Sequence, residues 1–161
     1  MEKGFGTTRA MRGGAWALIA IPAVLGLLYL GACAPMMALM HGRVERPAAS
    51  EFGFGPRQSA RGLYVATIEP TETLRVRRMH RLRLTLRAAD QAPVEDVSIT
   101  IDGGMPEHGH GLPTKPRVTG NPGPGVYQID GLKFNMGGWW ELRFRIASAA
   151  GTDSVTFNLE L

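Results

Sequence analysis

Residues 81–87 constrain the fold most, because apolar and polar side chains alternate there without a break. Leu82, Leu84 and Leu86 fall on one face of an extended chain, while three arginines and a threonine fall on the other. A period of two predicts a β-strand with one buried and one solvated face. The same alternation returns in three later segments, 97–102, 140–146 and 155–161. Such strands need a second apolar face to pack against.

The remaining pattern extends this prediction to a whole domain. Residues 63–68 and 126–129 are two further strands, and 72–78 is a short strand or a turn. Because no helical stretch interrupts them, we predict an all-β, immunoglobulin-like β-sandwich of about seven strands. The alternation places Trp140 in the core and leaves Trp139 free on the opposite face.

The N-terminal part of the chain has the composition of an export signal. Residues 15–32 carry no charged side chain and follow a basic segment. The sequence Leu30-Gly31-Ala32-Cys33 resembles a lipobox, in which the cysteine is lipidated. The apolar run also continues to Met40, which is long enough for a retained membrane-spanning helix. Simple secretion is a third alternative.

We therefore predict three parts: a signal peptide with lipobox or a membrane anchor at 1–33, a flexible tether at 34–60, and the sandwich at 61–161. The membrane, reached through lipid or an N-terminal helix, is the first expected partner. All alternatives place the sandwich outside the cytoplasm, and the two anchored ones leave it facing the periplasm or the cell exterior.

Charge argues against nucleic acid as a partner. The net charge is +4, and from Ala34 onward fifteen basic residues stand against thirteen acidic ones. Binding driven by phosphate contacts needs a strongly one-sided charge. The arginines between residues 75 and 87 are predicted to form a solvated strand face, with anionic lipid or a partner protein as the alternative.

A candidate metal site lies in the glycine- and proline-rich segment 103–125, which is long enough for a functional loop. Met105, His108 and His110 fall within six residues, and Met136 follows in a second glycine-rich segment. Thioethers suit Cu(I), and imidazoles suit both copper states. The chain has one cysteine, so a soft-metal site in the domain has to rest on methionine. We predict that these four side chains meet at one end of the sandwich and bind copper.

Other interpretations of the same residues stay open. Met105 and Met136 could cover the open end of the core, and His108 and His110 could belong to a solvated turn. The domain would then be a structural or adaptor module in the assembly of a membrane complex, such as a respiratory oxidase or an efflux system.

No Ser-His-Asp arrangement can be placed. Glu107 is the only carboxylate near the histidines, so an open zinc site with Glu107 as base is a weak alternative. We predict no enzyme.

Three runs carry a resemblance to a known family: Asp102-Gly103-Gly104-Met105-Pro106-Glu107-His108-Gly109-His110-Gly111-Leu112-Pro113, Gly125-Val126-Tyr127, and Phe134-Asn135-Met136-Gly137-Gly138-Trp139-Trp140. Over residues 62–161 the chain resembles the YtkA-like domain family, which is related to FixH-like proteins. The resemblance implies a small exported or membrane-anchored β-sandwich associated with copper handling or with oxidase assembly. Met105, His108, His110 and Met136 match the family's motif positions. An envelope metalloprotein or a membrane complex is the partner that it implies.

Overall fold

The computed structural model describes residues 44–161. The predicted signal or anchor at 1–33, its Cys33 and the first part of the predicted tether lie outside the described residues. Residues 44–161 form one compact unit by themselves. Within this part, no helix has the length and the apolar composition that spanning a bilayer requires.

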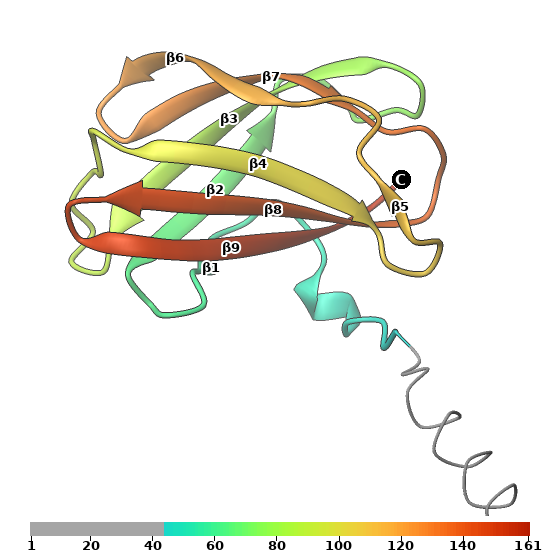
Figure 1. The fold of residues 1–161 in the computed structure, drawn as a ribbon, viewed down its shortest axis with the longest axis horizontal. Helices are drawn as coiled ribbons and strands as arrows, with labels where there is room; N and C mark the ends of the chain where they lie inside the picture. The colour runs from blue at the N-terminus through green and yellow to red at the C-terminus, as the bar shows by residue number, and fades with distance from the viewer. Residues whose placement is uncertain (1–43) are drawn as a thin grey trace, which may run out of the picture. The chain divides into compact units, whose positions relative to one another are not determined.

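Residues 44–161 contain one short 3-10 helix and nine strands, and Figure 1 shows their arrangement. The helix η1 spans Ala49–Glu51. The strands are β1 Arg57–Gln58, β2 Tyr64–Pro70, β3 Met79–Ala88, β4 Ser98–Met105, β5 His110–Gly111, β6 Arg117–Gly123, β7 Val126–Lys133, β8 Trp139–Ser148 and β9 Gly151–Glu160.

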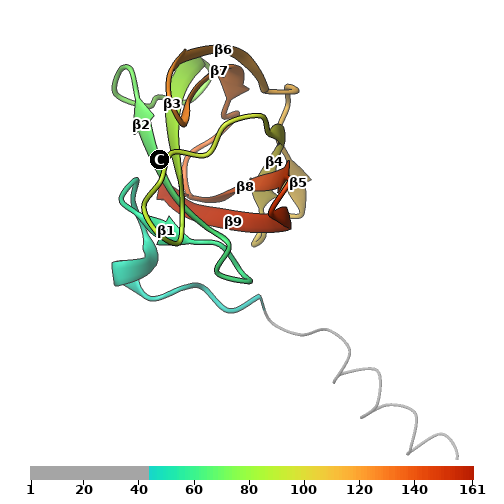
Figure 2. The ribbon, with the colours of Figure 1, turned by 90° about the vertical axis from the view of Figure 1, so that its left-hand side faces the viewer.

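These strands form two antiparallel sheets that face each other, as the end-on view in Figure 2 shows. One sheet has the order β1-β2-β3-β7-β6, and the other has the order β5-β4-β8-β9. The predicted all-β sandwich is therefore confirmed. The count is nine instead of about seven because β1 and β5, two residues each, pair at the outer edges of the two sheets.

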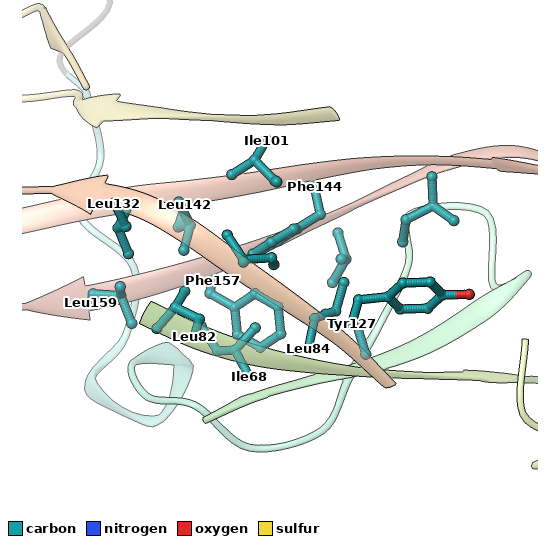
Figure 3. Packing of buried hydrophobic residues seen from close by; sticks show 14 of the residues in the cluster. Ile68, Leu82, Leu84, Ile101, Tyr127, Leu132, Leu142, Phe144, Phe157 and Leu159 are labelled. Carbon is teal, nitrogen blue, oxygen red and sulfur yellow. The ribbon is translucent and has the colours of Figure 1, made fainter. Parts of the chain in front are cut away.

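The core lies between the sheets and follows the alternation in the sequence. Leu82, Leu84 and Leu86 of β3 are completely buried and belong to the core cluster. Figure 3 shows Leu82 and Leu84 together with apolar residues of the second sheet. Among those residues, Phe144 and Phe157 meet edge to face with ring centroids 5.8 Å apart. Complete burial of each leucine side chain stabilises the fold by about 1.5–3 kcal/mol.

Two predicted segments can be compared with the structure. Residues 72–78, predicted to be a short strand or a turn, form the turn between β2 and β3. The segment 103–125 is predicted as a long loop with a candidate short strand at 116–119. In the structure β4 continues to Met105, β5 follows, and β6 (Arg117–Gly123) overlaps the candidate strand and extends beyond it. Glycine allows this close pairing: a Cβ on Gly103 would lie 2.5 Å from the Glu141 carbonyl oxygen of β8.

The segment 44–60 packs onto the sandwich, although we predicted a flexible tether there. Phe52 bridges to Asn158 of β9, and β1 pairs with β2. Ser59 donates a hydrogen bond of 2.6 Å to the buried carboxylate of Asp153. Any flexible tether is therefore shorter than predicted, because the backbone and side chains from Phe52 onward already have partners in the domain.

The burial of Trp139 also differs from the prediction. It was expected to be free, yet it is 1% exposed. Phe52 covers it edge to face at 6.4 Å, and the guanidinium of Arg46 lies 5.9 Å from its ring centroid. Its indole nitrogen donates to the Asn158 side chain at 3.0 Å. The covering residues belong to the segment that the sequence assigned to the tether, so alternation alone did not reveal them.

Candidate metal site

A tight hairpin between β4 and β5 carries three of the four predicted ligands. Met105 and His110 stand opposite each other in the pairing, and Gly104 stands opposite Gly111. The amides of His108 and Gly109 both donate to the Met105 carbonyl, at 3.1 and 2.9 Å. Gly109 adopts a φ of 65°, which glycine reaches without steric cost. The turn therefore brings His108 and His110 back beside the end of β4.

The two histidines are exposed and lie close to each other. Their rings are nearly parallel, with an interplanar angle of 14° and centroids 6.2 Å apart. The neighbouring Glu107 lies 3.5 Å from Arg46, which also pairs with Glu160. Because this carboxylate already has a cationic partner, the arrangement gives no support to Glu107 as a catalytic base.

Met136 lies in the loop between β7 and β8, and backbone contacts fix that loop. The indole nitrogen of Trp140 donates to the Met136 carbonyl at 3.1 Å. Gly138 and Leu161 exchange two backbone hydrogen bonds, of 2.8 and 3.2 Å. The Met136 side chain remains 40% exposed. It is neither buried in the core nor located at the opposite end of the sandwich.

The two loops meet around one hollow of about 280 Å³. Its lining residues are Met105, His110, Gly111, Asn135, Met136 and Trp140. Met105 is the fixed part of this lining because it is 1% exposed and belongs to the core cluster. A Cβ on Gly138 would lie 3.1 Å from the Met105 methyl carbon, so the absence of a side chain there lets the two loops touch.

The structure thus brings Met105, His110 and Met136 to the same hollow. His108 does not line this hollow, and its ring centroid lies 6.2 Å from that of His110. Within residues 44–161, no three histidine, cysteine or carboxylate side chains gather as a metal-binding group. A metal at this place would need the thioethers. Trp140 and Asn135 also line the hollow; both stood in the motif at 134–140, but nothing in the sequence marked them as lining residues.

A second hollow of about 330 Å³ lies behind the hairpin, on the outer face of β4 and β8. His110 borders it together with Asp102, Glu141 and Arg143. Arg143 donates to Glu141 at 3.0 Å and to Asp102 at 3.2 Å. Both carboxylates therefore have a cationic partner, so they are weak candidates for metal ligands.

Comparison with known proteins gives the family. A family model described as YtkA-like matches residues 59–145, which span β2 to β4, the site hairpin, β6, β7 and most of β8. The chain belongs to the YtkA-like family. No curated protein matches this YtkA-like chain. A solved structure described as "ZirS C-terminal Domain" is 18% identical, with a TM-score of 0.38, and the match covers 74% of this chain and 84% of that one. So loose a likeness says nothing about the function of the YtkA-like domain.

Proposed function

We propose that this protein is a cell-envelope copper-binding domain that delivers or buffers copper through Met105, His108, His110 and Met136. The observation that carries the proposal is that two loops far apart in sequence contribute Met105, His110 and Met136 to one hollow. Thioether sulfur is a soft ligand that suits Cu(I), and imidazole accepts either copper state. Copper is favoured over zinc, because the protein sites of zinc are built from thiolate, imidazole and carboxylate.

The spacing of the histidines is compatible with a shared metal. A metal–nitrogen bond to imidazole is about 2 Å long, so two imidazoles on one metal have ring centres at most about 6 Å apart. The observed 6.2 Å lies at that limit. Because both rings are exposed, small side-chain rotations can bring them together. His108 would then enter the site on metal binding, and His110 would link it to the two methionines.

The accessibility of the site suits a protein that passes a metal on. Met105 is held in the core, while Met136 is 40% exposed and His108 and His110 face solvent. A partner could therefore reach one thioether and both imidazoles directly. We further propose that residues 1–33 anchor the protein through lipidated Cys33 or through a membrane helix, with the sandwich facing the periplasm or the cell exterior.

The strand order supports the immunoglobulin-like interpretation. If the two-residue strands are set aside, β2-β3-β7-β6 faces β4-β8-β9. This is the four-plus-three arrangement of a constant-type immunoglobulin sandwich. In that arrangement loops gather at the two ends, which explains how Met105 and Met136 reach the same place. The related FixH-like affiliation remains an expectation from the sequence motif.

Cu(I) titration of the full chain against a chromogenic chelator, without oxygen, tests the proposal. The test variant combines Met105→Leu, Met136→Leu, His108→Gln and His110→Gln. Leucine retains the volume of Met105, so the core stays filled. We expect Cu(I) affinity to fall at least about tenfold, since even second-shell changes cost metal sites this much. Cys33 is present in every variant, and its contribution therefore cancels.

A matched pair of single variants controls for exposed methionines in general. Met136→Leu should weaken Cu(I) binding, whereas Met79→Leu, which removes another exposed thioether outside the hollow, should not. Equal affinity of the fourfold variant and the wild-type chain would refute copper binding at this site. The adaptor alternative would gain support if the fourfold variant still co-purified with an oxidase or efflux component.

A further inference from the structure

The turn between β2 and β3 carries a cationic surface that the copper proposal does not use. Arg75, Arg77 and Arg78 are exposed there, and within residues 44–161 none of them has a carboxylate within ion-pair distance. On the adjoining strand, by contrast, Arg81 pairs with Asp130 and Arg83 with Glu69. The arginines predicted to form one solvated face therefore include two groups: those of β3 that pair with a carboxylate, and the unpaired ones of the turn.

Exposed apolar side chains lie between these arginines. Val76 is 39% exposed and Met79 is 56% exposed, the highest value among the large apolar residues of the described part. We call residues Arg75 to Met79 the cationic tip. The one acidic residue of the turn, Glu72, lies 3.3 Å from the buried ring of His80. A surface that is both basic and apolar fits the interfacial region of an anionic membrane.

The backbone of the cationic tip is held in a fixed shape. Arg77 has a φ of 63°, a left-handed conformation that glycine adopts without steric cost. Its amide donates to the Phe134 carbonyl at 2.6 Å. An arginine thus occupies a position where the local conformation favours glycine. Gln91 and Asp96 also adopt positive φ, so this conformation alone assigns no function to Arg77; it shows that surrounding contacts hold the turn in one shape.

The cationic tip lies at the same end of the sandwich as the candidate metal site. Met79 pairs with Lys133 in the β3–β7 register, and Met136 follows three residues later. Arg46, among the first described residues, contacts Glu107 of the site hairpin. The sequence upstream of this point contains the uncharged segment 15–32. The described part of the chain therefore begins at the end of the sandwich that carries the cationic tip.

We propose that the cationic tip contacts anionic lipid headgroups, with Val76 and Met79 entering the interface between headgroups and acyl chains. This contact rests on the anchoring included in the proposed function. It would turn the end that bears Met136, His108 and His110 toward the bilayer, where a membrane-embedded partner presents its own surface. The recognised chemistry is phosphate-bearing lipid at a membrane surface.

Amide hydrogen exchange of the full chain on vesicles tests this proposal. The chain is reconstituted in vesicles of phosphatidylcholine alone, or of phosphatidylcholine mixed with phosphatidylglycerol. We expect residues 75–79 to exchange at least about fivefold more slowly on the anionic vesicles, which is the gain that one cation near such a surface supplies. High salt should remove the difference, because it screens exposed charges.

Two triple variants with equal loss of charge sharpen the test. Arg75→Gln, Arg77→Gly and Arg78→Gln together should abolish the protection, and glycine at 77 relieves backbone strain, so folding is retained. The control combines Arg61→Gln, Arg87→Gln and Arg145→Gln, which are exposed and outside the cationic tip. This control should retain the protection.

The remaining outcomes separate the two proposals. If the chain stays with the vesicles but exchanges equally on both compositions, the lipid contact is refuted while the anchor stands. If the chain does not stay with the vesicles, the anchoring fails, and the lipid contact fails with it. Protection by soluble polyglutamate but not by anionic vesicles would refute the lipid contact in favour of an acidic protein partner.

Discussion

At the scale of single residues, Asp130 shows how one carboxylate joins three strands. It accepts hydrogen bonds from the Arg81 side chain of β3, from Thr119 of β6 at 2.7 Å, and from Gln128 of its own strand β7 at 3.1 Å. These bonds, that from Arg81 first, lower the pKa of Asp130 from 3.8 to about 2. The interaction stabilises the edge of the first sheet only while the carboxylate is ionised.

A pH dependence of stability follows from this shift. Because the folded pKa is below the unfolded one, the contribution of Asp130 is complete above about pH 4 and is lost as the pH falls toward about 2. We expect Asp130→Asn to unfold with a shallower dependence on pH in that window. Urea unfolding measured at several pH values checks this, and parallel curves for the two proteins would contradict it.

At the scale of elements, the β4–β5 hairpin requires glycine at position 104 but not at position 111, which pairs with it. A Cβ on Gly104 would lie 2.5 Å from the His110 carbonyl oxygen, which is backbone and cannot move aside. A Cβ on Gly111 would come no closer than 3.8 Å to the Gly103 carbonyl oxygen. The hairpin that positions Met105 against His110 therefore closes because Gly104 lacks a side chain.

This asymmetry gives a paired prediction. Gly104→Ala should destabilise the domain by about 2 kcal/mol and weaken Cu(I) binding, since His110 would be displaced from the hollow. Gly111→Ala should leave the stability nearly unchanged and should lower Cu(I) affinity less than Gly104→Ala does, although Gly111 lines the hollow. Chemical denaturation and the Cu(I) titration measure the two effects. Equal behaviour of the two variants would show that the hairpin relaxes more easily than its geometry indicates.

At the scale of the whole molecule, the segment 44–58 completes the sandwich from outside. Phe52 and Arg46 cover Trp139, and the amide of Gly53 donates to the Asn158 carbonyl at 2.9 Å. Arg46 also contacts Glu107, so the segment reaches the hairpin that carries the candidate site. Arg46 therefore takes part both in covering Trp139 of the second sheet and in holding the β4–β5 hairpin.

Removal of this cover should be visible in fluorescence. In Phe52→Ala, Trp139 gains access to water, so tryptophan emission should shift to longer wavelength, and unfolding should require about 1–2 kcal/mol less. Phe54→Ala is the matched control, because Phe54 is already 39% exposed. Among residues 44–161, the aromatic ring that packs against Trp139 is that of Phe52 and not that of Phe54. An unchanged spectrum in Phe52→Ala would mean that Trp139 stays buried without this cover.

The sequence by itself determined the two-layer, all-β architecture and the core of β3 and β8. A period of two assigns each side chain to a face, and this local rule needs no information from distant residues. The candidate ligands Met105, His108, His110 and Met136 were also named from residue type and spacing alone.

Only the tertiary structure decided which distant segments meet. It brought Met105, His110 and Met136 to one hollow, placed Phe52 over Trp139, and separated the unpaired arginines of the cationic tip from the paired Arg81. The extension of β4 through Gly103 and Gly104 also depends on partner strands. The physical reason is common to all of these: pairing, burial and charge neutralisation depend on residues far along the chain, and a local pattern does not identify those partners.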